Sequence, residues 1–122
     1  MNRLSKVLLG LLGLVSLVGS GHAAPKVELK PVEYKVGSLT MKGTIAWDAN
    51  QKGARPGIIV VHEWWGHNDY AKKRAQMLAE KGYTALAVDM YGDGKTAQHP
   101  DDAGKFMKEL TADPATVKAR FL

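Results

Sequence analysis

The sequence predicts an α/β fold in which an antiparallel hairpin leads into a parallel sheet, and three observations support this fold class. Residues 32–36 and 39–47 alternate apolar and polar side chains on either side of Gly37-Ser38, which is typical of a half-buried hairpin. Residues 57–62 and 83–88 are continuous apolar runs. A helix-length segment separates these two runs, so they form a βαβ unit, and the whole pattern is that of an α/β domain.

The first 23 residues are predicted to be a cleaved signal peptide. Arg3 and Lys6 give a basic start, Val7–Val18 is a run without charge, and small residues follow. We expect cleavage after Ala23, because Gly21 and Ala23 then occupy the two positions that the peptidase reads. The alternative is an uncleaved anchor. Since an anchor needs roughly 20 apolar residues, the sequence favours export without a stable membrane anchor.

The partial domain that follows, residues 24–122, begins with less regular sequence around its hairpin. Ala24–Pro31 is predicted to be an extended arm that precedes the first strand. Asp48–Pro56 is rich in turn formers and is predicted to be a polar loop.

The βαβ unit has clear boundaries in the sequence. The β-branched run at 57–62 predicts a strand that is buried on both faces of a parallel sheet. A helix is expected to start after Asn68 or Asp69 and to run through Lys81, with Gly82 as its left-handed C-terminal residue. The next strand is expected to end at Asp89. The buried stripe of the helix is predicted to be Ala71, Ala75, Leu78 and Ala79.

Two further helices are expected at the C-terminal end. One starts at Asp101 or Asp102 and runs through Leu110, and another starts at Pro114 and is interrupted at Leu122. Because parallel sheets are stable only when both faces are covered, four strands are expected to leave apolar surface exposed. This predicts either further C-terminal sequence or a poorly folded fragment.

Charge and cysteine content exclude several classes of function. Without Arg3 and Lys6, 15 of the 17 basic residues remain against 12 acidic ones, and they are spread along the chain. The short cluster Lys72-Lys73-Arg74 is interpreted as a solvated helix face, so nucleic acid is not expected as a partner. The chain has no cysteine, which excludes disulfides and thiolate metal sites within it.

The most informative segment is His62-Glu63-Trp64-Trp65-Gly66-His67, at the carboxyl end of a predicted strand, where α/β sheets bind ligands. One interpretation is a zinc site. However, the two histidines are five residues apart, about 140° around a helix, and do not share a helical face. A second interpretation is structural, with the tryptophans packing and His62 hydrogen-bonding to the backbone. The third is that this loop forms half of an acyl-transfer site.

The third interpretation gains weight from a resemblance to a known family. The run P-G-I-I-V-V-H-E-W-W-G, then a helix, then G-Y-T-A-L-A-V-D-M-Y-G, resembles the dienelactone hydrolase family of the α/β-hydrolase superfamily. The resemblance covers most of residues 32–122, and it implies the N-terminal portion of an α/β-hydrolase fold. A glutamate in this loop is unusual among α/β-hydrolases, which makes the match fairly specific.

The resemblance also implies roles for four residues. Glu63 matches the family glutamate that helps the nucleophilic cysteine to form its thiolate. The backbone N–H of Trp64 matches the second donor of the oxyanion hole. Trp65 and Tyr91 are implied to line the substrate pocket, and no cofactor or metal ion is expected. A carboxylate can accept a thiol proton, and losing one oxyanion donor costs roughly 10²–10³ in rate.

The sequence departs from the family pattern in two places. Family enzymes that act on the anionic dienelactone hold its carboxylate with an arginine, whereas Asp93 stands at about that position and would repel an anion. Lys95 could compensate. The family also needs G-x-C-x-G or its serine version, but Ser38 is the only serine after residue 23 and lies in the hairpin turn. Asp89 and His99 precede the expected nucleophile, so neither is the family acid or base, and His99 is interpreted as a solvated loop residue.

These residues predict an exported hydrolase of carboxylic esters or lactones that acts on small molecules through a covalent acyl-enzyme. The nucleophile is expected to be missing from this chain, so the chain alone is expected to be inactive. The alternative is a non-catalytic exported binding protein that keeps the α/β-hydrolase fold, since fold does not fix function.

Overall fold

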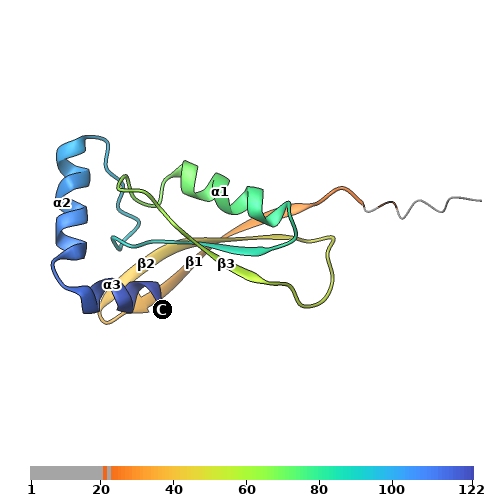
Figure 1. Cartoon of the computed structure of the whole chain (residues 1–122), viewed down its shortest axis with the longest axis horizontal. Helices are drawn as coiled ribbons and strands as arrows, with labels where there is room; N and C mark the ends of the chain where they lie inside the picture. The colour runs from red at the N-terminus through yellow and green to blue at the C-terminus, as the bar shows by residue number, and fades with distance from the viewer. Residues whose placement is uncertain (1–20, 22) are drawn as a thin grey trace, which may run out of the picture.

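A computed structural model describes residue 21 and residues 23–122, and the predicted signal peptide lies almost wholly outside these residues. Within them, no helix is both long and apolar enough to span a membrane. The elements, shown in Figure 1, are the strands β1 (Val27–Val36), β2 (Leu39–Asp48), β3 (Gly57–Val61) and β4 (Thr84–Val88) and the helices α1 (Asp69–Ala79), α2 (Pro100–Thr111) and α3 (Pro114–Phe121).

The strands form one mixed sheet in the order β1-β2-β4-β3. The predicted hairpin is confirmed, because β1 pairs antiparallel with β2, and the predicted βαβ unit is confirmed by the parallel pairing of β3 with β4. The predicted arm at Ala24–Pro31 is wrong in its second half. Val27 already pairs with Asp48, because the long β2 offers backbone partners along its whole length and extends β1 by five residues.

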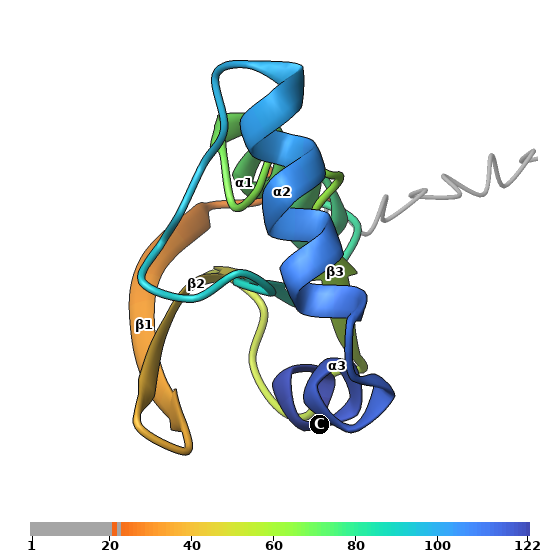
Figure 2. The ribbon, with the colours of Figure 1, turned by 90° about the vertical axis from the view of Figure 1, so that its left-hand side faces the viewer.

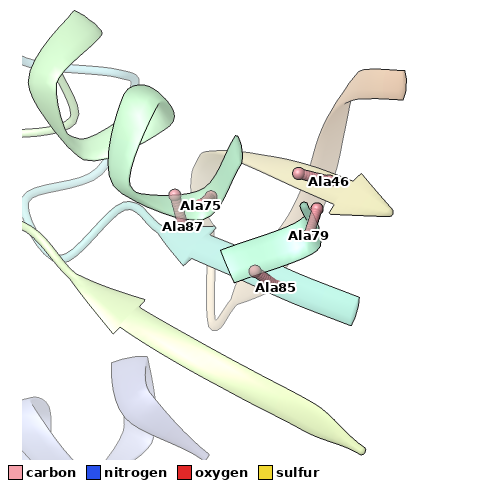
Figure 3. Packing of buried hydrophobic residues seen from close by; sticks show 5 residues of the cluster. All are labelled: Ala46, Ala75, Ala79, Ala85 and Ala87. Carbon is pink, nitrogen blue, oxygen red and sulfur yellow. The ribbon is translucent and has the colours of Figure 1, made fainter. Parts of the chain in front are cut away.

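Helix α1 covers one face of the sheet through a cluster of small side chains. Ala75 and Ala79 of α1 pack against alanines of β2 and β4, as Figure 3 shows. An alanine side chain ends at its Cβ atom, so the helix approaches the sheet closely, and larger residues there would overpack the contact. The fully buried members of this cluster are Ala46, Ala75, Ala79, Ala85 and Ala87. The predicted apolar stripe of the helix is thereby confirmed, with Leu78 partly buried beside it.

The opposite face is covered only near the carboxyl end of β4. Val88, Met90 and Tyr91 pack there against Leu110 of α2, with Val117 of α3 at the margin. Figure 2 shows α2 and α3 meeting at this end of the sheet. The second cluster therefore holds the segment that follows β4 beneath the two C-terminal helices.

Strand β3 contradicts the prediction of a strand buried on both faces. Ile58 and Val60 are partly buried on the α1 side, whereas Ile59 and Val61 on the other face are 45% and 48% exposed. The reason is topological, because β3 lies at an edge of the described sheet and no element covers its second face. The expectation that apolar surface stays uncovered is confirmed.

The helix ends follow the capping rules closely. Asn68 caps α1 by accepting a hydrogen bond from the Ala71 N–H, and Gly82 has the expected positive φ of 92°. Helix α1 itself ends at Ala79 with Glu80 as its C-cap, so the predicted end at Lys81 is wrong. Helix α2 begins at Pro100 and not at the predicted aspartates. His99, interpreted above as a solvated loop residue, is exposed but caps α2, because its ring nitrogen accepts from the Asp101 N–H.

Candidate active site

A tight turn follows β3 and carries the two residues that the sequence singles out for catalysis. The Gly66 N–H donates to the Glu63 carbonyl at 3.2 Å, which closes the turn. Gly66 has a φ of 93°, and a Cβ atom there would overlap the Lys95 carbonyl oxygen. The Ala97 N–H also donates to the Trp65 carbonyl at 2.9 Å. The chain therefore needs glycine here, and the segment after β4 holds the turn in place.

His62 joins the ends of β3 and β4. Its Nε2 accepts a hydrogen bond of 3.0 Å from the Met90 N–H, and its Nδ1 contacts the Glu63 carbonyl oxygen. Its ring lies 4.8 Å from the ring of Tyr91, centroid to centroid. Both ring nitrogens thus meet backbone groups, as the structural interpretation of His62 expects.

A buried carboxylate organises the loop that follows β4. Asp89 is fully buried and accepts four backbone hydrogen bonds of 2.8–3.1 Å, from Lys42 in β2 and from Tyr91, Gly92 and Gly94. Buried carboxylates are tolerated when their oxygens are saturated in this way. Asp89 therefore folds the loop back on itself and joins it to the sheet.

Tyr91 connects this loop to the turn after β3. Its hydroxyl donates to the Trp64 carbonyl at 2.8 Å, and burial raises the pKa of that hydroxyl above its ordinary value, so it remains a donor. On the other side, the Arg120 guanidinium donates to the carbonyls of Met90 and Tyr91 at 2.8 and 3.2 Å. Helix α3 therefore also holds the tyrosine.

Glu63, Trp64 and Tyr91 line one open hollow of about 240 Å³. The surface that lines this hollow is almost entirely apolar, and Glu63 is an exposed residue. Asp93 and Lys95, the residues at which the sequence departs from the family, are not among its lining residues. The remaining lining residues are Val61, His62, Met90, Met107, Leu110 and Val117.

The two tryptophans of the turn are placed differently. Trp64 is 39% exposed and lines the hollow, whereas Trp65 is half-buried and is not among the residues that line it. Their rings pack against each other with centroids 5.1 Å apart. Of the four predicted site residues, the structure therefore brings together Glu63, Trp64 and Tyr91 and leaves Trp65 behind Trp64.

His67 lies behind the turn and not in the hollow. It is 7% exposed, and its Nε2 lies 2.9 Å from the Thr44 hydroxyl of β2. Its Nδ1 is buried and has no hydrogen-bond partner among the described residues. Burial, and then the positive charge of Lys72, lower the pKa of His67 below its ordinary value, and the Asp89 carboxylate opposes this shift.

The zinc interpretation finds no geometric support in the part of the chain that the structure describes. Among residues 21 and 23–122, no three histidine or acidic side chains gather as a metal site would require. His62 is engaged with backbone groups and His67 with Thr44, so they do not face a common point.

Asp89 is the site residue that sequence reasoning missed. From the sequence, Asp89 is only excluded as the family acid and is assigned no structural role. The signal that points to Asp89 is an aspartate at a strand end with glycines three and five residues later, since such glycines let backbone N–H groups turn towards a carboxylate.

Comparison with known proteins places this geometry in a family. Residues 41–121 match the model described as the dienelactone hydrolase family. Over 82 residues the chain is 39% identical to the protein usf of Aquifex pyrophilus. It is also 39% identical over 82 residues to an Aquifex aeolicus protein named as a candidate carboxymethylenebutenolidase. Each alignment covers 65% of this chain and 34% of the relative, so the chain spans about one third of their length.

Solved structures agree with the sequence comparison. The chain is similar to m3DLH, with a TM-score of 0.72 and 35% identity over 76% of this chain and 39% of that one. It is also similar to a dienelactone hydrolase-like promiscuous phosphotriesterase from metagenomic libraries, with a TM-score of 0.73 and 34% identity over 77% and 39% of the two chains. The sheet order, the turn after β3 and the match over residues 41–121 identify the chain as a member of the dienelactone hydrolase family, with the N-terminal portion of an α/β-hydrolase fold.

Proposed function

We propose that this chain supplies the activating carboxylate and one oxyanion donor of an exported hydrolase that cleaves small carboxylic esters or lactones. The observation that carries the proposal is the shared hollow at the carboxyl end of β3, where Glu63, Trp64 and Tyr91 meet. Ligands of α/β sheets bind at this end of the strands, and membership of a hydrolase family supports the same chemistry.

The turn geometry supports Trp64 as the oxyanion donor. Among the described residues, no acceptor takes a hydrogen bond from the Trp64 N–H, whereas the carbonyls of Glu63, Trp64 and Trp65 all accept hydrogen bonds. A free N–H in a backbone held by other bonds is suited to stabilise negative charge that develops on a carbonyl oxygen.

Glu63 is proposed to act as the carboxylate that activates the nucleophile. Glu63 lines the apolar hollow and is exposed, so its carboxylate is accessible to accept a proton from a thiol or hydroxyl that enters there. The nucleophile itself is proposed to come from residues that this chain does not supply. The chain has no cysteine, and Ser38 lies in the turn between β1 and β2.

Export is proposed from the arrangement of the first 23 residues, with a basic start, an uncharged apolar run and small residues before Ala24. N-terminal sequencing of the protein recovered from outside the cytoplasm is expected to start at Ala24. Recovery of protein that still begins at Met1 or Asn2 would contradict cleavage.

The catalytic role of Glu63 is tested in a longer protein that contains this chain together with a G-x-C-x-G or G-x-S-x-G turn. With p-nitrophenyl acetate as substrate, Glu63→Gln is expected to lower kcat/KM by about 10²-fold or more, because the amide cannot accept the nucleophile's proton. Glu33→Gln is the matched control, since Glu33 is exposed on β1 and does not line the hollow.

The same assay tests the chain by itself. The 122-residue chain is expected to show no hydrolysis above buffer, because it lacks a positioned nucleophile. Hydrolysis by this chain that is lost in Glu63→Ala would overturn that part of the proposal. Unchanged kinetics of Glu63→Gln in the longer protein would remove Glu63 from the mechanism and favour the non-catalytic alternative.

A further inference from the structure

We propose that His62 is a positioning residue, which orients the Glu63–Trp64 peptide group so that the Trp64 N–H points away from the turn and towards the reacting carbonyl. This inference rests on the proposed function for its catalytic meaning. The geometry that carries it involves only the chain's own hydrogen bonds.

The two partners of His62 define its tautomer. A backbone N–H can only donate, so the Nε2 that receives the Met90 N–H must carry a lone pair. A backbone carbonyl can only accept, so the Nδ1 that contacts the Glu63 oxygen must carry the proton. The ring is therefore a neutral Nδ1–H imidazole that donates to Glu63 and accepts from Met90.

The Glu63 carbonyl is held from two directions. It accepts from His62 Nδ1–H and from the Gly66 N–H, the latter at 3.2 Å. The Glu63–Trp64 peptide is trans, like every other peptide in the described residues, so it is a planar unit in which the N–H is directed opposite to the C=O. Fixing the Glu63 oxygen therefore fixes the direction of the Trp64 N–H.

The following peptide is held as well. The Trp64 carbonyl accepts from the Tyr91 hydroxyl at 2.8 Å, and the Tyr91 ring lies 4.8 Å from the His62 ring. Both peptide groups that flank the Trp64 Cα are thus anchored, which limits rotation about its backbone dihedrals. No acceptor among the described residues takes a hydrogen bond from the Trp64 N–H that lies between these two anchored carbonyls.

This arrangement separates a positioning role from a direct catalytic one. Both nitrogens of His62 already meet backbone groups, so neither is available to take a proton from a nucleophile. A ring with both nitrogens protonated would present an N–H to the Met90 N–H and lose that bond. His62 therefore acts on the reaction only through the backbone that it holds.

Nuclear magnetic resonance of the 122-residue chain measures the tautomer of the His62 ring and the mobility of the Trp64 N–H directly. Long-range ¹⁵N–¹H spectra at pH 8 are expected to show His62 as the Nδ1–H tautomer, with exposed His99 as the internal reference. Amide relaxation is expected to show a rigid Trp64 N–H, with an order parameter of about 0.85. An Nε2–H tautomer, or a Trp64 order parameter below about 0.6, would overturn the proposal.

Two variants distinguish orientation from simple packing. In His62→Gln the amide can still donate to Glu63 and accept from Met90, so the Trp64 order parameter is expected to stay within experimental error. In His62→Phe the ring volume is kept but both hydrogen bonds are lost, so the Trp64 order parameter is expected to fall. Equal order parameters in both variants would overturn the proposal, and the tautomer measurement decides it if His62→Phe does not fold.

Turnover provides an independent readout in the longer protein described above. His62→Phe is expected to lower kcat by about 10- to 100-fold with little change in KM, because an oxyanion donor acts mainly in the transition state. His62→Gln is expected to keep most of the kcat of the unsubstituted protein. A KM effect without a kcat effect would contradict the positioning role. If Glu63→Gln leaves turnover unchanged while the tautomer is as predicted, the proposed function fails and the orientation of the peptide stands.

Discussion

At the scale of single residues, the site depends on buried polar groups that meet backbone atoms. Asp89, His62 and Tyr91 each bind a main-chain group of a neighbouring segment. Such bonds cost little when every polar atom is satisfied and much when one partner is removed. The positions of Glu63 and Trp64 therefore depend on side chains that hold the backbone around them.

Asp89→Asn is expected to destabilise the chain by about 2–4 kcal/mol, because hydrogen bonds to a charged group contribute about 1.5–3 kcal/mol each. The amide nitrogen would face two of the four backbone N–H donors that now point at the carboxylate. Urea unfolding monitored by circular dichroism measures the change. The control is Asp93→Asn. Asp93 is exposed and has a φ of 54°, which asparagine tolerates, so this substitution should change the free energy of unfolding by no more than about 0.5 kcal/mol.

At the scale of elements, the turn after β3 is built from contacts between segments that are distant in sequence. The hairpin, the βαβ unit and the Asn68 cap of α1 follow from local patterns, and the structure confirms them. The turn depends instead on a close approach between Gly66 and the Lys95–Thr96 backbone, which form an isolated bridge. No periodicity in the sequence encodes that approach.

Gly66→Ala is expected to cost about 2–4 kcal/mol of stability, since the positive φ penalises a side chain and the Cβ atom would overlap the Lys95 carbonyl. Gly53→Ala is the matched control. Gly53 has a φ of 85°, but a Cβ atom there would meet nothing within 4 Å. It should therefore cost only the backbone penalty of about 1–2 kcal/mol. Equal losses in the two variants, measured by thermal unfolding, would show that the approach of Gly66 to Lys95 is not tight.

At the scale of the whole molecule, the two faces of the sheet are covered unequally. Helix α1 covers one face with a tightly packed alanine cluster, whereas the other face is covered only at the end that carries the site (Figures 1 and 3). The exposed side chains of Ile59 and Val61 lie on this second face. The chain spans about one third of the length of the curated relatives it matches.

The global stability of the chain is expected to fall on acidification because His67 is buried. Burial and Lys72 lower its pKa in the folded state below the ordinary 6.5, so between these two values the unfolded chain binds more protons. The contribution of His67 is therefore fully present above pH 6.5 and is lost as the pH falls through the folded-state pKa. Asp89 and His62 also act on this imidazole, the first favouring and the second opposing its charged form.

Urea titrations from pH 5 to pH 8 measure this dependence. In His67→Gln the rise in unfolding free energy with pH is expected to be smaller than in the unsubstituted chain. An unaltered pH dependence in His67→Gln would show that His67 is not the group responsible.

The amino-acid sequence by itself determined the fold class, the hairpin, the βαβ unit and the position of the Glu63–Trp64 turn at the end of a strand, because hydrophobic periodicity and capping residues act over a few neighbours. Only the tertiary structure decided that β1 extends back to Val27, that β3 lies at an edge with one face exposed, and that Asp89 and His62 hold the site. These features arise from hydrogen bonds and coverage between segments that lie far apart in the chain, and local sequence patterns do not carry that information.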